Sequence, residues 1–299
     1  MEKETGIETD TPIIKHLVMA GGGSIGLSMY GIIRESNKAN IWNIQNIKTI
    51  YGTSSSSLLG VIIALNFDWD ILDDYIIHRP WEQVYNFDIE TIFNLMDTRG
   101  IFDKTVFVDT LSPLFKAKDI SLDITIKEFY ELTGIETHFF ATEINEFKLV
   151  DFSYKTHPDW KIIDAVFCSS ALPILMKPLI INEHCYCDGG IFMNYPIDPC
   201  IENGAKEDEI IGIMKGCDTE SNAIDENANV FEYLSSIIYK ITNKVLSSSQ
   251  NEKIRYKYTV FSPPVNAYNI LMTASSTEER MRLIQLGSDI FHEKNNSIV

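Results

Sequence analysis

The sequence predicts an α/β fold in which helices flank a central, mostly parallel sheet. The first observation is its opening pattern, in which apolar β-like runs at 13–20 and 47–51 alternate with helix-like runs at 26–36 and 55–66. The second is that a glycine-containing turn stands wherever one of these strands passes into a helix. Strands joined by a crossover helix run parallel, and the helices cover the faces of their sheet.

The rest of the chain predicts a helical insertion followed by a second group of strands. Residues 68–133 have a helical pattern with breaks at Pro80, Gly100 and Pro113, and Thr125 begins the last of these helices with a capping box. Further elements are expected as strands at 136–142, 147–152, 179–182, 184–187, 209–215 and 256–261, and as helices at 160–171, 231–247 and 277–294.

The chain shows no internal repeat and no low-complexity tract that would divide it. Its polar and acidic stretch at 216–229 is predicted to be an exposed loop. We therefore expect one domain over 1–299, best supported over 14–215, with 216–299 as a C-terminal extension of the same domain.

The charge balance excludes one class of partner. The formal net charge is −17, with 25 basic against 42 acidic residues. Nucleic-acid binding rests on clustered Lys and Arg, so no nucleic-acid partner is expected. Residues 1–11 lack the features of a signal peptide, and the longest apolar run, 58–65, is too short to span a bilayer. We expect a cytoplasmic protein that meets any lipid substrate by peripheral membrane contact.

The five cysteines predict free thiols rather than a disulfide framework or a metal site. Their number is odd and their spacing is irregular. Cys185 and Cys187 would face the same side of a strand, but a metal site needs two more ligands and only His184 is close. No metal and no cofactor are expected.

Three short motifs together supply what acyl transfer needs. The turn from Gly21 to Gly26 offers free backbone N–H groups at the start of a helix. The run Gly52–Ser56 places Ser54 on a tight strand-to-helix turn. Asp188 is followed by Gly189 and Gly190, which let the chain approach closely. The set predicts an oxyanion site, a nucleophile and a base.

The first turn also matches a dinucleotide-binding fingerprint through Gly21, Gly23 and Gly26. That site requires an acidic residue at the end of the next strand, and none stands there. A phosphate-binding loop fails as well, because Leu27 occupies the position of its lysine. Nucleotide binding and a purely structural turn remain the alternatives to an oxyanion loop.

The serine and the aspartate have simpler alternatives of their own. Ser54 sits in a G-x-S-x-G motif whose last glycine is replaced by Ser56, and serines at a helix start often only cap it. Asp188 before two glycines is often only a turn. A Ser-Asp-His triad would need a histidine after Asp188, and His292, on a predicted surface helix, is the only one there.

The order and content of the three motifs resemble the patatin-like phospholipases, which are serine acyl hydrolases with a Ser-Asp dyad. The similarity covers roughly 14–215 and extends to a small-residue helix that ends at a proline and to the segments around the aspartate, namely 165–173, 177–181, 185–190 and 194–196.

The resemblance implies a three-layer patatin-like fold and a role for each motif. Ser54 is the expected nucleophile, Asp188 the base, and the N–H groups of Gly22 and Gly23 the oxyanion donors. The chain departs from the family at Ile25, where an Arg or Lys is usual. That departure predicts cleavage of neutral acyl esters at least as readily as phospholipids.

The expected function is therefore hydrolysis of fatty-acyl esters of lipids through an acyl-enzyme. The alternative from another class is a catalytically weak lipid-binding or effector protein that uses the same pocket, and Ile25 and Ser56 are the residues that favour it. Nucleotide binding is the third possibility.

Overall fold

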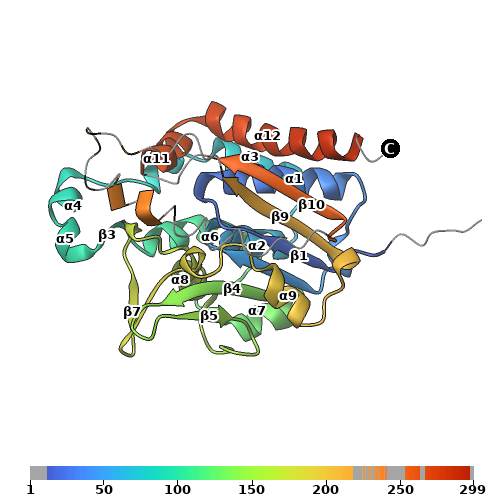
Figure 1. Ribbon diagram of the computed structural model, residues 1–299, viewed down its shortest axis with the longest axis horizontal. Helices are drawn as coiled ribbons and strands as arrows, with labels where there is room; N and C mark the ends of the chain where they lie inside the picture. Colours follow the sequence, from blue (N-terminus) through green and yellow to red (C-terminus); the bar gives the residue numbers. More distant parts are fainter. Residues whose placement is uncertain are drawn as a thin grey trace, which may run out of the picture.

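The computed structural model describes residues 12–217, 253–262 and 267–296, with scattered residues between 224 and 240. In these ranges the centre is an eight-stranded sheet of order β10-β9-β1-β2-β4-β8-β7, with β5 paired to β4 (Figure 1). The strands are β1 His16–Met19, β2 Thr49–Thr53, β4 Glu136–Glu143, β5 Lys148–Phe152, β7 Leu179–Ile181, β8 His184–Asp188, β9 Ile210–Cys217 and β10 Tyr256–Ser262.

The sheet is mostly parallel, as predicted. The pairs β10–β9, β9–β1, β1–β2 and β2–β4 are all parallel. The pairs of β4 with β5 and β8, and of β8 with β7, are antiparallel. The direction therefore reverses beyond β4, which brings the end of β8 toward the end of β2.

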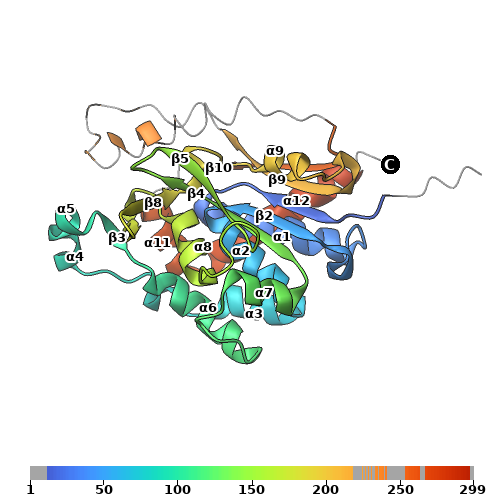
Figure 2. The same ribbon diagram turned by 90° about the horizontal axis from the view of Figure 1, so that it is seen from below.

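Helices cover both faces of the sheet, which confirms the predicted α/β fold. Figure 2 shows α1 (Gly26–Lys38), α2 (Ser55–Ala64) and α8 (Ile162–Ser170) on one face and the short α9 (Ile197–Glu202) on the other. The remaining long helices are α3 Trp69–His78, α6 Thr105–Ala117, α7 Ile126–Thr133, α11 Ala267–Ser275 and α12 Thr277–Asn296. The C-terminal α12 packs on α1, where Ser28 Oγ donates to the Leu283 carbonyl at 2.7 Å.

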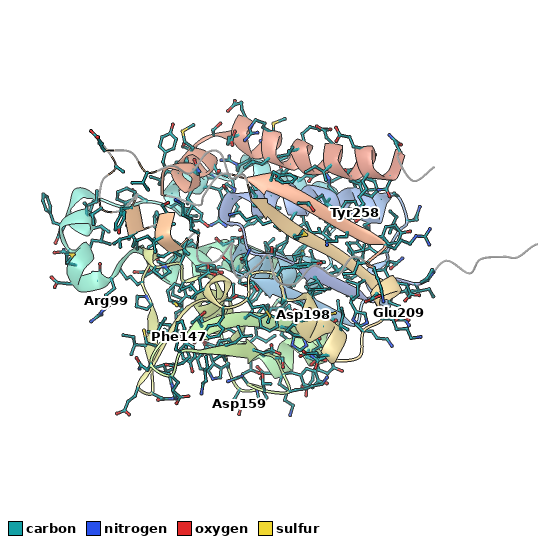
Figure 3. The ribbon with its side chains drawn as sticks, in the orientation of Figure 1. Arg99, Phe147, Asp159, Asp198, Glu209 and Tyr258 are labelled. Atoms are coloured by element: carbon teal, nitrogen blue, oxygen red, sulfur yellow. The ribbon has the colours of Figure 1, made fainter. Side chains whose placement is uncertain are left out.

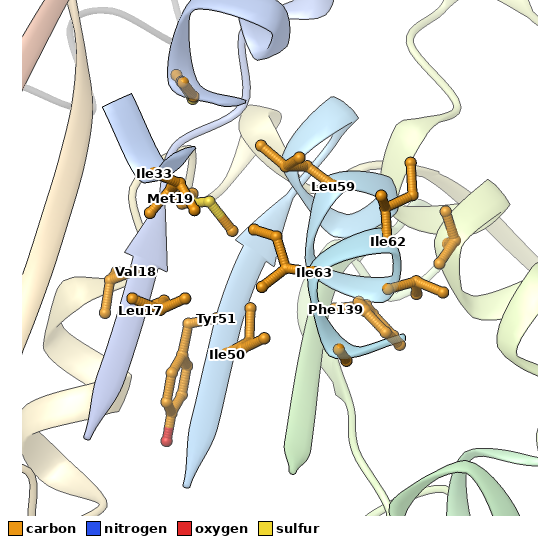
Figure 4. Close-up of a cluster of buried hydrophobic side chains, with 14 of the residues drawn as sticks. Leu17, Val18, Met19, Ile33, Ile50, Tyr51, Leu59, Ile62, Ile63 and Phe139 are labelled. Atoms are coloured by element: carbon orange, nitrogen blue, oxygen red, sulfur yellow. The ribbon is translucent and has the colours of Figure 1, made fainter. Parts of the chain in front are cut away.

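The core lies between the sheet and α2. Ile50 of β2 and Ile63 of α2 point toward one another there (Figure 4), and Leu17, Met19 and Phe139 are also fully buried. Burial of each such side chain stabilises the fold by about 1.5–3 kcal/mol. The core thus fixes α2 behind the strand end that carries Ser54.

One predicted helix break is wrong. Pro113 lies inside α6 rather than at its end. A proline removes the N–H that would bond the carbonyl four residues earlier. That carbonyl, of Asp109, instead accepts from Nη2 of Arg79 at 2.9 Å, so the helix continues.

The other breaks and the capping box are confirmed. α3 ends two residues before Pro80, and Gly100 begins a strand, β3 (Gly100–Phe102). Thr125 and Glu128 make both bonds of the capping box. The pairing of β3 with β6 (Ile174–Met176) was not predicted, nor were α9 and α11.

Two predictions fall where little of the chain is described. The loop expected at 216–229 and the helix expected at 231–247 lie largely outside the described residues. Among the helices of the described ranges, none combines the length and the apolar character needed to cross a bilayer.

Candidate active site

Ser54 occupies a strained elbow between β2 and α2. Its backbone angles are φ 57° and ψ −131°, a region that residues other than glycine rarely adopt. Its N–H donates to Ser169 Oγ at 3.0 Å, and its carbonyl accepts from Ser57 Oγ at 2.6 Å. Gly52 permits the turn, because a Cβ there would lie 2.5 Å from the Ser56 carbonyl oxygen. The strain is held by bonds on both sides of the serine.

Ser56, which replaces the last glycine of the motif, is accommodated and bonded. Its side chain is fully buried, and its Oγ donates to the Ala20 carbonyl at 2.6 Å. The hydroxyl therefore ties the start of α2 to the end of β1.

Asp188 meets Ser54 because β2 and β8 run toward each other along one edge of β4 and meet there end to end. β2 ends at Thr53, whose register partner on β4 is Phe140. β8 approaches from the opposite direction and ends at Asp188, whose partner is the next residue, Ala141. β5 pairs with this part of β4 as well, so β2 and β8 share its other edge. The Ser54 side chain is thereby brought close enough to the Asp188 carboxyl to lower its pKa as a hydrogen-bond donor.

The surroundings of Asp188 raise its basicity. Burial raises the pKa of this carboxyl to about 6. Three opposing effects lower it: the bond from Ser54, the bond from the Gly190 N–H at 2.7 Å, and the charge of Lys215. A carboxylate with a pKa near neutrality is a better general base than an ordinary aspartate.

The glycine turn is tied to the segment after Asp188. The Gly21 N–H donates to the Asn194 carbonyl at 3.0 Å, and Asn194 Nδ2 donates to the Gly21 carbonyl at 2.9 Å. The N–H groups of Gly22 and Gly23 donate to no acceptor in the described part of the chain. Gly26 follows as the first residue of α1. The loop thus holds two unused donors at a helix start.

Ile25 is a core residue. It is buried, and a Cβ on Gly22 would lie 2.5 Å from its Cδ1. Where the patatin-like family usually has an Arg or Lys, this chain therefore has an apolar side chain that packs inside the glycine turn.

An apolar cavity of about 200 Å³ begins at Ser54. Gly23 and Ser55 line it at the serine. Its walls come from α1, α2, α6, α11 and the segments around Trp81 and Met176. A cavity with this lining can hold a hydrocarbon chain, with its carbonyl carbon at the serine.

The histidines lie elsewhere. His292 is 3.7 Å from Glu35, and His184 is 3.6 Å from Glu143. None of the hydrogen bonds of Ser54 in the described residues involves a histidine. Cys185 and Cys187 are free thiols, and no cluster of three or more metal-ligating side chains occurs in the described ranges.

Three residues near the site escaped the sequence analysis as individual site residues. Asn194 anchors the glycine turn, Ser169 holds the Ser54 N–H, and the buried Lys215 acts on Asp188. Lys215 carried a signal, since it is a single cation at the end of an otherwise apolar strand.

The family model described as patatin-like phospholipase matches residues 17–201 of this chain. The chain is 30% identical over 208 residues to "Probable lipid hydrolase 463L" of Invertebrate iridescent virus 6, a match covering 67% of this chain and 69% of the viral protein. It is 25% identical over 197 residues to "Uncharacterized protein R571" of Acanthamoeba polyphaga mimivirus, covering 66% and 65%.

A solved structure has a similar fold. VipD from Legionella pneumophila superposes with a TM-score of 0.53 at 17% identity, over 96% of this chain and 67% of that chain. At this identity the likeness concerns the fold alone.

Proposed function

Because this chain belongs to the patatin-like phospholipase family, we propose that it hydrolyses fatty-acyl esters of lipids through an acyl-enzyme on Ser54. The observation that carries the proposal is that the ends of β2 and β8 bring Ser54, which lines an apolar cavity, next to the carboxyl of Asp188. A serine next to a base, at the wall of an apolar cavity, is the arrangement that cleavage of a fatty-acyl ester requires.

In the first half-reaction, Ser54 Oγ attacks the ester carbonyl carbon while Asp188 takes the hydroxyl proton. The tetrahedral oxyanion accepts hydrogen bonds from the N–H groups of Gly22 and Gly23, and one such donor contributes about 2.7–4 kcal/mol of transition-state stabilisation. Collapse of the intermediate breaks the ester bond, and Asp188 returns the proton to the departing alcohol. The acyl chain stays on Ser54 Oγ with its tail in the cavity.

In the second half-reaction, Asp188 takes a proton from water, and the hydroxide attacks the acyl carbonyl. The same donors hold the second oxyanion. Its collapse releases the fatty acid, and the proton returns to Ser54 Oγ.

The apolar lining of the cavity favours substrates that are recognised by their acyl chain. Ile25 places no charge beside the oxyanion turn, so we propose that neutral acyl esters are cleaved at least as readily as phospholipids. We further propose action in the cytoplasm, with peripheral contact to lipid, in keeping with the free thiols of Cys168, Cys185, Cys187 and Cys200.

We also propose that 1–299 forms one domain. The support is that β9 and β10 extend the same sheet as β1, and that α12 packs on α1.

Fluorophosphonate labelling tests the proposal. Wild-type protein should be labelled at Ser54 and should cleave a soluble short-chain ester, and Ser54→Ala should lose both. The matched control is Ser121→Ala, which removes an exposed hydroxyl far along the chain and should change neither. Lipid binding without labelling would instead favour the binding-protein alternative that the departures at Ile25 and Ser56 suggest.

A further inference from the structure

Two short helices project from one end of the molecule and carry exposed apolar side chains. They are α4 (Ile89–Phe93) and α5 (Leu95–Thr98), and Figures 1 and 2 both place them at the end farthest from the chain terminus marked C. Phe93 is 78% exposed and Met96 is 90% exposed, and Ile92 is exposed as well. We call Ile92, Phe93 and Met96 the α4–α5 tip. Side chains of this size so fully exposed mark an interaction surface.

The α4–α5 tip is attached to the wall of the cavity at both of its ends. Before α4, the chain contributes Trp81 and Tyr85 to the lining of the cavity. After α5, β3 pairs with β6, whose Leu175 and Met176 also line the cavity. The ring of Tyr85 packs edge-on against Phe102 of β3 at 5.6 Å, which closes the base of the projection. The segment that carries the tip therefore begins and ends at the wall of the cavity that Ser54 lines.

Helix α11 adds apolar surface at the same end of the molecule (Figure 1). Its residues Ile270 and Ala274 line the cavity. On the same helix, Tyr268 is 68% exposed and Met272 is also exposed. One helix therefore presents apolar groups both to the cavity and to the outside.

The charges around the tip restrict what can cover it. Asp88, Glu90 and Asp97 are exposed on or next to α4 and α5, and Arg99, labelled in Figure 3, is the cation at their end. The whole chain carries −17. An anionic membrane would be repelled, whereas a zwitterionic lipid surface would not.

We propose that the α4–α5 tip, together with Tyr268 and Met272, inserts into a zwitterionic lipid surface, from which an acyl chain passes into the cavity. This inference rests on the proposed function, since it supplies the route by which that substrate reaches Ser54. Apolar side chains on short helices bind the interfacial region by burying their surface there.

The test measures binding to phosphatidylcholine vesicles by sedimentation, with all proteins in the Ser54→Ala background so that no lipid is consumed. The parent should bind, and addition of anionic phosphatidylserine should weaken its binding. Phe93→Ser/Met96→Ser should lower the partition coefficient at least about tenfold, because burial of one large apolar side chain is worth that much.

The matched control is Ile71→Ser/Met281→Ser, which removes two apolar side chains that are 51% and 52% exposed on α3 and α12. It should bind vesicles like the parent. Equal loss in both double variants, or binding only to anionic vesicles, would overturn the proposal. So would a parent dimer that fails to bind vesicles and dissociates in Phe93→Ser/Met96→Ser, because the tip would then be a self-association surface.

Hydrolysis of a soluble short-chain ester separates this inference from the proposed function. With Ser54 restored, Phe93→Ser/Met96→Ser should cleave that ester at the wild-type rate while losing activity on vesicles. A wild-type protein that binds vesicles but cleaves no ester would refute the proposed function and leave the docking surface standing.

Discussion

Gly21 lies directly against Ser54: a Cβ atom at position 21 would stand 2.8 Å from the Ser54 Cβ and 2.5 Å from Asn194 Oδ1. Neither distance is sterically acceptable, so the glycine turn and the serine elbow fit together only without a side chain at this position. The donors of Gly22 and Gly23 are thereby fixed relative to the serine hydroxyl.

Gly21→Ala should therefore fold with lowered stability and lose at least about 100-fold in kcat/KM, since displacement of a catalytic group by about 1 Å costs that much. Gly204→Ala is the control, because Gly204 has φ 93° and nothing within 4 Å of its Cβ position. It should cost about 1–3 kcal/mol of stability and leave kcat/KM unchanged. Full activity in Gly21→Ala would show that the glycine turn does not stabilise the transition state.

The raised pKa of Asp188 makes the rate depend on pH. Its carboxyl must be ionised to accept a proton, so kcat/KM on a soluble ester should rise with pH up to about 6 and then level off. Asp188→Asn should abolish this activity. A rate that is constant between pH 4.5 and 8 would exclude Asp188 as the base.

The same ionisation costs stability. Asp188 has its folded-state pKa, about 6, above the usual 3.8, so the folded chain keeps this proton longer and its stability falls as pH rises from 3.8 to 6. The Asp188→Asn variant has no carboxyl to ionise, so its stability does not fall in this way between pH 3.8 and 6. Relative to wild type, the variant should gain about 2 kcal/mol more free energy of unfolding at pH 8 than at pH 4.5, measured in urea. Equal differences at both pH values would contradict the buried-carboxyl explanation.

Ser56→Gly restores the family motif and should nevertheless destabilise the protein. It removes the bond to the Ala20 carbonyl and adds a helical glycine, together about 2 kcal/mol. Ser55→Gly is the control, because its hydroxyl has no partner among the described residues. It should cost only the glycine contribution of about 1 kcal/mol. Thermal unfolding of the two variants compares them directly.

Arg280 joins the ends of two helices at the cavity. Its buried guanidinium donates to the carbonyls of Ile77 at the end of α3 and of Thr273 and Ala274 near the end of α11, at 2.7–2.9 Å. Lysine carries its three donors on a single nitrogen, so it cannot span the two helices as the planar guanidinium does. Arg280→Lys should lose about 2–4 kcal/mol of stability and raise KM for long-chain esters, since α11 forms a cavity wall.

The control is Arg282→Lys, two residues along the same helix. Arg282 is exposed and, among the described residues, bonds Glu279 alone, so its replacement should change stability by no more than about 0.5 kcal/mol. If Arg280→Lys loses as little stability as Arg282→Lys, a positive charge is sufficient at position 280 and the bonds to α3 and α11 do not matter.

The candidate site was predictable because its signals are local. A glycine before a serine at a strand end predicts an elbow, and Ser54 has the φ of 57° that this turn requires. The same holds for the glycine turn before α1 and for the turn after Asp188. The parallel order of β1 and β2 also follows from neighbouring segments.

What escaped prediction depends on contacts between distant segments. β3 and β6 have three residues each and exist only as partners of one another. The helix through Pro113 depends on Arg79, which comes from before β3. Asn194 acquires its role from Gly21, which follows β1 and lies far from Asn194 in the sequence. No window of the sequence contains both members of any of these pairs.

The end-to-end meeting of β2 and β8 along β4 has a consequence for the time at which chemistry first becomes possible. Ser54 and its elbow lie early in the chain, whereas Asp188 lies far along it and is placed beside Ser54 by the antiparallel pairing of β8 with β4. A slip of one residue in that pairing would turn Asp188 to the opposite face. A growing chain that ends before β8, or a chain in which this pairing is wrong, therefore holds Ser54 without the carboxylate that we propose as its base.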